Sequence, residues 1–98
     1  AERSPLLPDV PPVAEQGFAG YAAASWMALA APARTPPAVI AALNAALNAA
    51  LAQAEVRRGL LALGAVPVGG SPAELDAFVQ AELAKWAAVV RQSGMRLD

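Results

Sequence analysis

Residues 69–94 read GGSPAELDAFVQAELAKWAAVVRQSG, and this stretch carries the clearest structural signal in the chain. Ser71 and Glu74 have the spacing of a capping box, in which a serine hydroxyl and a glutamate carboxylate satisfy free N–H groups at a helix start. Pro72 takes the first helical position, where its missing N–H costs nothing. Because Gly94 is suited to end a helix, the stretch predicts one long helix from Pro72 to just before that glycine.

The same helix carries an apolar stripe. Large apolar side chains recur at spacings of three and four, which places them on one helix face. They are Leu75, Phe78, Val79, Leu83, Trp86, Val89 and Val90. The stripe predicts a face packed into the core, with Trp86 as a core residue rather than a stacking platform. The preceding Gly69-Gly70 pair is not a phosphate loop, because its spacing fits no nucleotide motif and no lysine follows.

Two further helices are predicted upstream. Thr35 suits an N-cap and Pro36 the first helical position. An apolar stripe follows, formed by Ile40, Leu43, Leu47 and Leu51. Gln53 to Glu55 predicts a bend, after which a shorter helix is ended by Gly64. That helix is lined by Val56, Leu60, Leu61 and Leu63.

Asn44 and Asn48 stand four residues apart on a face beside the leucine stripe. Their side-chain amides can hydrogen-bond a ligand or a partner. The sequence favours a solvated pair or one that contacts a loop, because nothing else nearby suggests a binding site.

Three segments favour extended structure. Tyr21 to Ala31 contains tyrosine, tryptophan, methionine and leucine, which suit a strand, and Pro32 ends it. Ala65 to Val68 and Met95 to Leu97 are shorter candidates. Residues 1–12 contain four prolines and predict a loop, followed by one helical turn. The whole predicts an α/β protein of three or four helices and two or three short strands, too few for a complete sheet.

Composition excludes several classes of function. The chain has 98 residues, and 27 of them are alanines, which contribute little buried area. The net charge is −1 without a basic stripe, so nucleic acid is not expected as a partner. There is no cysteine or histidine, which removes disulfides, thiol and histidine catalysis and the usual zinc sites. We expect no catalytic residue, no metal and no cofactor.

One uncharged segment has the length of a membrane span. Thr35 to Ala54 carries no charge over twenty residues. It also contains two prolines, two asparagines and a glutamine, and its bulk is alanine rather than leucine. A helix in a soluble protein is therefore the favoured interpretation. The first residues lack the apolar region of a signal peptide.

Four stretches together resemble one family. They are RSPLLPDVPPVAEQGFAGY (3–21), SWMALAAPARTPPAVIAALNAAL (25–47), LLALGAVPVGGSPAELDAFVQAELAKW (60–86) and SGMRLD (93–98). In order and spacing they resemble the C-terminal third of tripartite tricarboxylate transporter receptors, the Bug-type bacterial periplasmic solute-binding proteins. The chain departs from the family pattern at Ala28, usually glycine, and at Gln53-Ala54, usually an Asp-Pro helix start.

The resemblance implies part of a type II-like periplasmic binding protein that closes over a small carboxylate and works with membrane components of the transporter. Residues 1–20 then belong to its second lobe, and residues 21–98 form the C-terminal part of its first lobe. Ser25 and Trp26 are expected near the hinge and the ligand cleft. Most carboxylate contacts are expected from elsewhere in the receptor, mainly backbone amides, helix N-termini and waters.

Two other classes of function remain open. A free-standing α/β interaction module that self-associates, most simply as a homodimer, is the main alternative. A small enzyme is the weakest hypothesis, because no base, nucleophile or metal cluster is visible.

Overall fold

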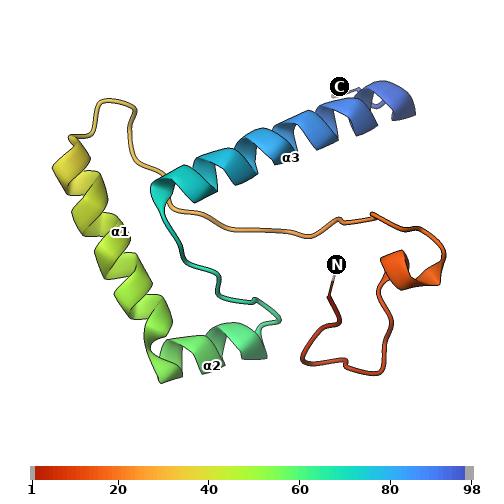
Figure 1. Ribbon diagram of the computed structural model, residues 1–98, viewed down its shortest axis with the longest axis horizontal. Helices are drawn as coiled ribbons and strands as arrows, with labels where there is room; N and C mark the ends of the chain where they lie inside the picture. Colours follow the sequence, from red (N-terminus) through yellow and green to blue (C-terminus); the bar gives the residue numbers. More distant parts are fainter. Residues whose placement is uncertain (1, 97–98) are drawn as a thin grey trace.

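The computed structural model describes residues 2–96, which form one short 3-10 helix and three α-helices. They are η1 (Val13–Gln16), α1 (Pro37–Ala52), α2 (Ala54–Ala62) and α3 (Pro72–Ser93). Figure 1 shows α1 and α2 meeting at a sharp bend, with α3 reached by a connecting chain. The extended run between η1 and α1 crosses the middle of the molecule and passes α3 (Figure 1).

The expected α/β fold is wrong, because no strand or sheet occurs among residues 2–96. A strand requires a second strand that supplies ladder hydrogen bonds. Tyr21 to Ala31 runs as an irregular extended segment, and no segment within the described residues forms such a ladder with it. Ala65 to Val68 is likewise only the connection from α2 to α3. Met95 and Arg96 are not in a strand, and Leu97 lies outside the described residues.

The α1 helix begins one residue later than predicted. Pro36 is the N-cap and Pro37 the first helical residue, without a side-chain cap hydrogen bond. Thr35 instead closes a turn, because its N–H donates to the carbonyl oxygen of Pro32 at 2.9 Å. The predicted bend is confirmed: Gln53 is extended (φ −68°, ψ 131°) and separates α1 from α2, which meet at 76°.

Within residues 2–96, no single helix is long and apolar enough to cross a membrane. The bent pair of α1 and α2 reaches the required length and apolarity only when the two are taken together.

The prediction for α3 is confirmed. The N–H of Glu74 donates to Ser71 Oγ at 3.2 Å, and the N–H of Ser71 donates to Glu74 Oε2 at 2.7 Å. These two hydrogen bonds complete the capping box. The pKa of the Glu74 carboxyl is lowered first by the bond from the N–H of Ser71 and second by a bond of 2.8 Å from the Ser71 hydroxyl to the same Oε2. Gly94 ends the helix with φ 68°, in the left-handed region that favours glycine.

The N-terminal loop is held by one arginine. Arg3 Nη2 and Glu15 Oε2 form an ion pair of 2.7 Å, and Arg3 Nη1 donates to the carbonyl oxygen of Pro8 at 3.1 Å. The predicted helical turn is η1, which Gly17 ends with φ 96°. The loop thereby folds back on itself before the extended segment begins.

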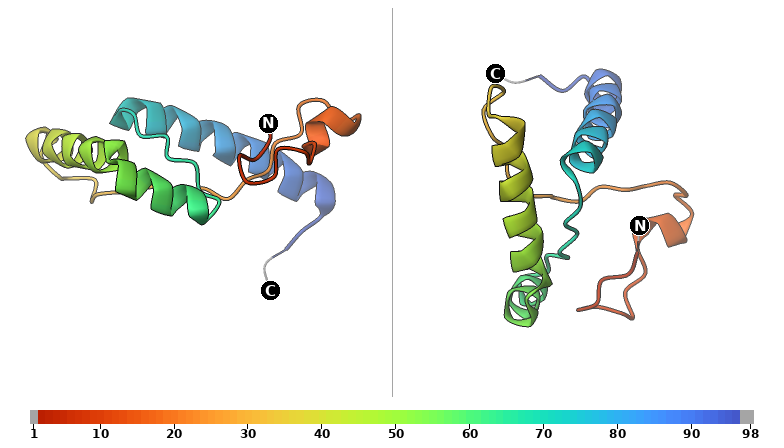
Figure 2. Two further views of the ribbon diagram at one scale, coloured as in Figure 1. Left: turned by 90° about the horizontal axis from the view of Figure 1, so that it is seen from below. Right: turned by 60° about the vertical axis from the view of Figure 1, so that its left-hand side comes forward.

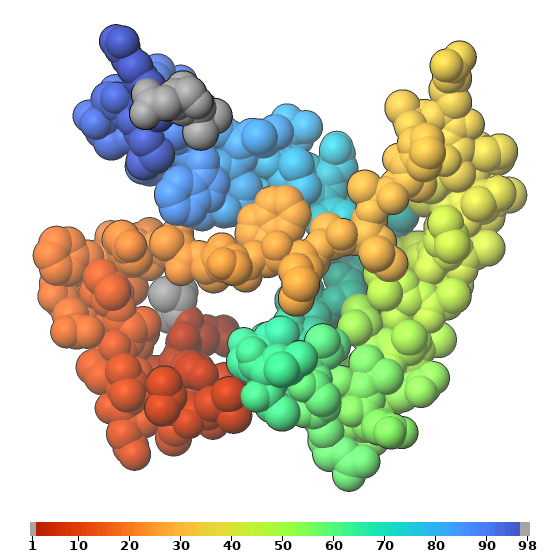
Figure 3. Space-filling view, turned by 180° about the vertical axis from the view of Figure 1, so that it is seen from behind, coloured from red at the N-terminus to blue at the C-terminus, as the bar shows by residue number. Residues whose placement is uncertain are grey.

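The helices form an open arrangement rather than a packed body. Figure 2 shows the elements spread around the crossing segment, and Figure 3 shows an opening bordered by that segment, α2 and the N-terminal loop. The radius of gyration is 16.7 Å, whereas a compact domain of this length has about 13 Å. The accessible surface is 8215 Å², against about 5,200 Å² for a folded monomer of this mass.

The apolar stripe of α3 is therefore not a core in this chain. None of residues 2–96 is buried, and Phe78 and Trp86 are 42% and 41% exposed. The predicted core role of Trp86 is wrong here, since a helix face becomes a core only where another element covers it. The stripe is present as a pattern, but no element of the described chain buries it.

Candidate functional site

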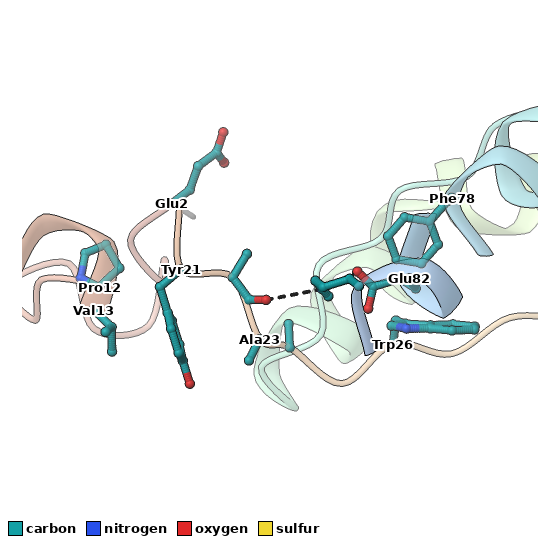
Figure 4. Close-up of a pocket in the computed structure, with 11 residues that line it drawn as sticks. Glu2, Pro12, Val13, Tyr21, Ala23, Trp26, Phe78 and Glu82 are labelled. Atoms are coloured by element: carbon teal, nitrogen blue, oxygen red, sulfur yellow. Dashed lines mark hydrogen bonds and ion pairs between the residues drawn. The ribbon is translucent and has the colours of Figure 1, made fainter. Parts of the chain in front are cut away.

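The main hollow of the molecule lies between the N-terminal loop, the extended segment and α3. It has a volume of about 420 Å³ and is open to solvent. Its lining includes Glu2, Tyr21, Trp26, Phe78, Glu82 and Lys85. Figure 4 shows Trp26, Phe78 and Glu82 gathered at one end of this hollow, with Tyr21 and Glu2 toward the other. Three segments far apart in the sequence therefore meet at one place.

The structure separates the two residues predicted for the site. Trp26 lines the hollow, whereas Ser25 is exposed and is not among its lining residues. The ring of Trp26 meets the ring of Phe78 edge to face, with 5.3 Å between centroids and 82° between planes. Such pairs are favourable because the positive edge of one ring faces the negative face of the other. Whether either predicted residue touches a ligand stays a prediction.

Glu82 is the polar centre of the hollow. Its Oε2 accepts a hydrogen bond of 2.8 Å from Nε1 of Trp86, one helical turn further along α3. Its Oε1 forms an ion pair with Lys85. These bonds lower the pKa of Glu82: the hydrogen bond from Lys85 contributes most, and the bond from Trp86 comes next.

Lys85 connects Glu82 to the extended segment. Its Nζ donates to the carbonyl oxygen of Ala22 at 3.2 Å (dashed line in Figure 4). The same ammonium lies 5.1 Å from the ring centroid of Trp86, within the range of a cation–π contact. One lysine therefore holds a carboxylate of α3 and a backbone carbonyl that lies 63 residues earlier.

The hollow suits binding and positioning rather than bond-making. Its aromatic and alanine surface is apolar, and its one lysine is already paired with Glu82. Glu2 adds a second carboxylate to the lining. Among the residues that the structure describes, no group of three or more acidic side chains could hold a metal ion. A carboxylate ligand would thus need cations or N–H donors from outside this lining.

A second polar cluster joins α1 to the start of α3. Nδ2 of Asn44 and Nδ2 of Asn48 each donate to the carbonyl oxygen of Gly70 at 2.8 Å. The N–H of Gly70 donates to Oδ1 of Asn48 at 2.9 Å. The prediction of a loop-contacting pair is confirmed. We call these three residues the asparagine clamp.

Sequence reasoning missed Glu82 and Lys85 as site residues. Their spacing to each other and to Trp86 puts all three on neighbouring positions of one helix face, a signal that was readable in the chain. The carbonyl of Ala22 had no such signal, because backbone groups look alike in every sequence. Gly70 as the partner of the clamp was equally unreadable.

Comparison with known proteins identifies the class of protein. A sequence profile described as "Tripartite tricarboxylate transporter family receptor" matches residues 1–95. The chain therefore belongs to this family of receptors, as the resemblance had indicated. No solved structure matches the chain.

Three relatives show how much of the family's length is covered. The chain is 38% identical over 97 residues to Protein BugT of Bordetella pertussis, covering 99% of this chain and 30% of that protein. It is 36% identical over 86 residues to the UPF0065 protein in tcbD-tcbE intergenic region of Pseudomonas sp. (strain P51), and this match covers 87% of this chain and 26% of that protein. It is 38% identical over 95 residues to the UPF0065 protein in the TAR-I ttuE-ttuC' intergenic region of Agrobacterium vitis, and this match covers 94% of this chain and 28% of that protein. The chain thus spans less than a third of these relatives.

Proposed function

We propose that the chain forms the C-terminal part of a periplasmic receptor that binds a small carboxylate and delivers it, without catalysis, to the membrane components of a tripartite transport system. The observation that carries this proposal is the family match over residues 1–95. Coverage of 30% of BugT supports a receptor that contains further chain. In this proposal residues 1–20 belong to one lobe and residues 21–98 to the other.

The exposed surface supports a large partner. The chain exposes 8215 Å², which exceeds the value for a folded monomer by about 3,000 Å². A symmetric pair that buried this excess on both copies would remove about 6,000 Å², above the range of about 2,000–5,000 Å² for most obligate interfaces. The area therefore favours the remainder of a receptor over a second copy of this chain.

The charges that line the hollow support a ligand site that this chain shares with the rest of the receptor. Lys85 is occupied by Glu82, so a carboxylate has no unpaired cation to meet among the described lining residues. Trp26, from the middle of the extended segment, offers an apolar wall at one end of the hollow (Figure 4). We propose that Trp26 borders the cleft, with Ser25 beside it, and that most donors to the ligand come from the rest of the receptor.

Isothermal titration calorimetry of the full polypeptide encoded by the gene tests the function. Citrate and smaller di- and tricarboxylates are titrated, with the neutral triamide of citrate as the matched control. We expect at least one acid to bind with a Kd on the order of 1 μM, about −8 kcal/mol, and the triamide not to bind. Residues 1–98 alone should show no binding. Failure of every acid to bind the full polypeptide would overturn the proposal, as would equal binding by residues 1–98 alone.

A further inference from the structure

Two segments that lie about 60 residues apart meet at Glu82. The extended segment contributes the carbonyl oxygen of Ala22 and the ring of Trp26, and α3 contributes Phe78, Glu82 and Lys85. Figure 4 shows the Glu82 carboxylate lying close to the Trp26 indole, with Phe78 on the same side of α3. The contacts at this junction are charged or aromatic.

Glu82 is the member that the others share. Its side chain is only 15% exposed, whereas that of Lys85 is 36% exposed. Two N–H donors reach its two oxygens, one from Lys85 and one from Trp86, and the indole of Trp26 lies beside the carboxylate (Figure 4). A carboxylate withdrawn from water needs such donors, because its lost hydration must be replaced. Glu82 therefore does more than neutralise the charge of Lys85, because it also accepts a hydrogen bond from an indole N–H.

We infer that Glu82 is a positioning residue of the receptor, which fixes Trp26 and the extended segment against α3 at the edge of the ligand cleft. The inference rests on the proposed function, in which Trp26 borders that cleft. Glu82 acts through Lys85, which carries the connection to Ala22, and through its own carboxylate, which lies beside the Trp26 indole (Figure 4) and accepts from the indole N–H of Trp86.

Other ionisable groups near Glu82 bear on its test. Lys85 faces it from α3, Tyr21 lines the hollow from the extended segment, and Glu2 lines it from the N-terminal loop. Glu2 is thus a second carboxylate in the lining of the same hollow. A pH experiment on Glu82 must therefore include Glu2→Gln as a control.

The first arm of the test is NMR of the indole N–H groups in the full polypeptide, labelled with ¹⁵N-tryptophan and assigned with Trp26→Phe and Trp86→Phe. We expect the Trp26 and Trp86 signals to shift together as the pH falls, with one midpoint below the ordinary range of a glutamate. Glu82→Gln should abolish both shifts, and Glu2→Gln should leave them. Lys85→Met should raise the common midpoint. A Trp26 signal that does not move with Trp86 would overturn the inference.

The second arm is the affinity of the same polypeptide for the acid that binds best. Removing a negative charge should strengthen binding of an anion if charge alone matters. Loss of positioning predicts the opposite, and we expect Glu82→Gln to weaken binding about tenfold, the scale of one well-placed hydrogen bond. Glu55→Gln on α2 makes the same charge change elsewhere and should not weaken binding.

The two arms separate the possible failures. If the unaltered polypeptide binds no carboxylate, the proposed function falls and takes the affinity part of this inference with it, while the NMR arm still decides whether Glu82 positions Trp26. If the unaltered polypeptide binds and Glu82→Gln binds equally or more tightly, the proposed function stands and the inference is overturned.

Discussion

Two junctions tie α3 to the rest of the chain, and they use different chemistry. At its N-terminal end the asparagine clamp holds Gly70 through uncharged amide hydrogen bonds of 2.8 and 2.9 Å. Further along α3, the junction with the extended segment depends on the Glu82–Lys85 ion pair, on the edge-to-face pair of Trp26 and Phe78, and on the cation–π contact of Lys85 with Trp86. Both junctions hold a backbone carbonyl, that of Gly70 in one and that of Ala22 in the other.

Because of this difference, the two junctions should respond differently to pH and to salt. Amide hydrogen bonds do not titrate and are little affected by salt, so the clamp sets the relation of α1 to α3 under all ordinary conditions. The junction at Glu82 loses its central charge at low pH and weakens as salt screens the ion pair. The extended segment can therefore leave α3 under conditions in which α1 stays attached.

The substitution expected to disrupt the asparagine clamp most is at Gly69, the residue before Gly70. Gly69 has φ +72°, and an added Cβ would lie 2.5 Å from Oδ1 of Asn48. Gly69→Ala should lower the free energy of unfolding by about 2 kcal/mol, because a left-handed conformation costs a non-glycine residue roughly 1–2 kcal/mol before any clash. Urea denaturation followed by circular dichroism measures the change.

Gly59 provides the matched control. It lies inside α2, and an added Cβ there would meet nothing within 4 Å. Gly59→Ala should raise the free energy of unfolding by up to about 1 kcal/mol through helix propensity. Equal effects of the two substitutions would show that Gly69 is not constrained by the clamp.

The next largest effect is expected within the clamp itself. Asn48→Ala removes an acceptor for the N–H of Gly70 and a donor to its carbonyl, and should cost about 1–1.5 kcal/mol after the gain in helix propensity. Asn44→Ala gains the same propensity but loses only one bond to Gly70, so it should cost about half as much. A larger loss for Asn44→Ala, in the same urea denaturation, would contradict the observed geometry.

The capping box is a second interaction at the end of α3 that the asparagine clamp holds, and its contribution to stability can be measured separately. Ser71→Ala removes the acceptor for the N–H of Glu74 and should cost about 1 kcal/mol. Ser93→Ala, near the other end of α3, is the control, since Ser93 donates only a 3.3 Å bond to the carbonyl oxygen of Val90. Its effect should lie within about 0.5 kcal/mol. Comparable losses for the two serines would mean that the cap contributes nothing specific.

The smallest effect is expected from pH. The pKa of Glu82 is lowered in the folded chain, first by Lys85, so its contribution is present above the pKa of the unfolded state and disappears as the pH falls through the folded pKa. Stability should fall between about pH 5 and pH 2. Glu74 titrates with the same sign, and Glu82→Gln and Glu74→Gln assign the two parts. Stability that rises in this range would show that the sign is wrong.

Much of the local structure was readable from the chain. The capping box, the glycine at the end of α3 and the bend at Gln53 were predicted from spacing alone, because the physics of each lies within a few neighbouring residues. The asparagine pair was expected to be either solvated or in contact with a loop, and the structure shows the contact. The start of α1 was misplaced by one position, since three successive candidates, Thr35, Pro36 and Pro37, all suit a helix start.

The strands were wrong for a different reason. Tyr21 to Ala31 has residues that suit a pleated surface, but suitability is not pairing, and ladder hydrogen bonds require a second segment at about 4.8 Å. The same holds for the apolar stripe of α3. Its pattern was predicted correctly, but its predicted burial was wrong. Burial and pairing depend on what lies opposite, which composition does not specify.

The sequence by itself determined both ends of α3, the bend, the apolar stripes and the family, because these depend on residue types at fixed spacings along one chain. Only the tertiary structure decided that Lys85 binds the carbonyl oxygen of Ala22, that Asn48 binds the backbone of Gly70, and that the apolar stripes stay exposed. The physical reason is that these features join groups 22 to 63 residues apart, and two of them end on backbone atoms that every residue carries.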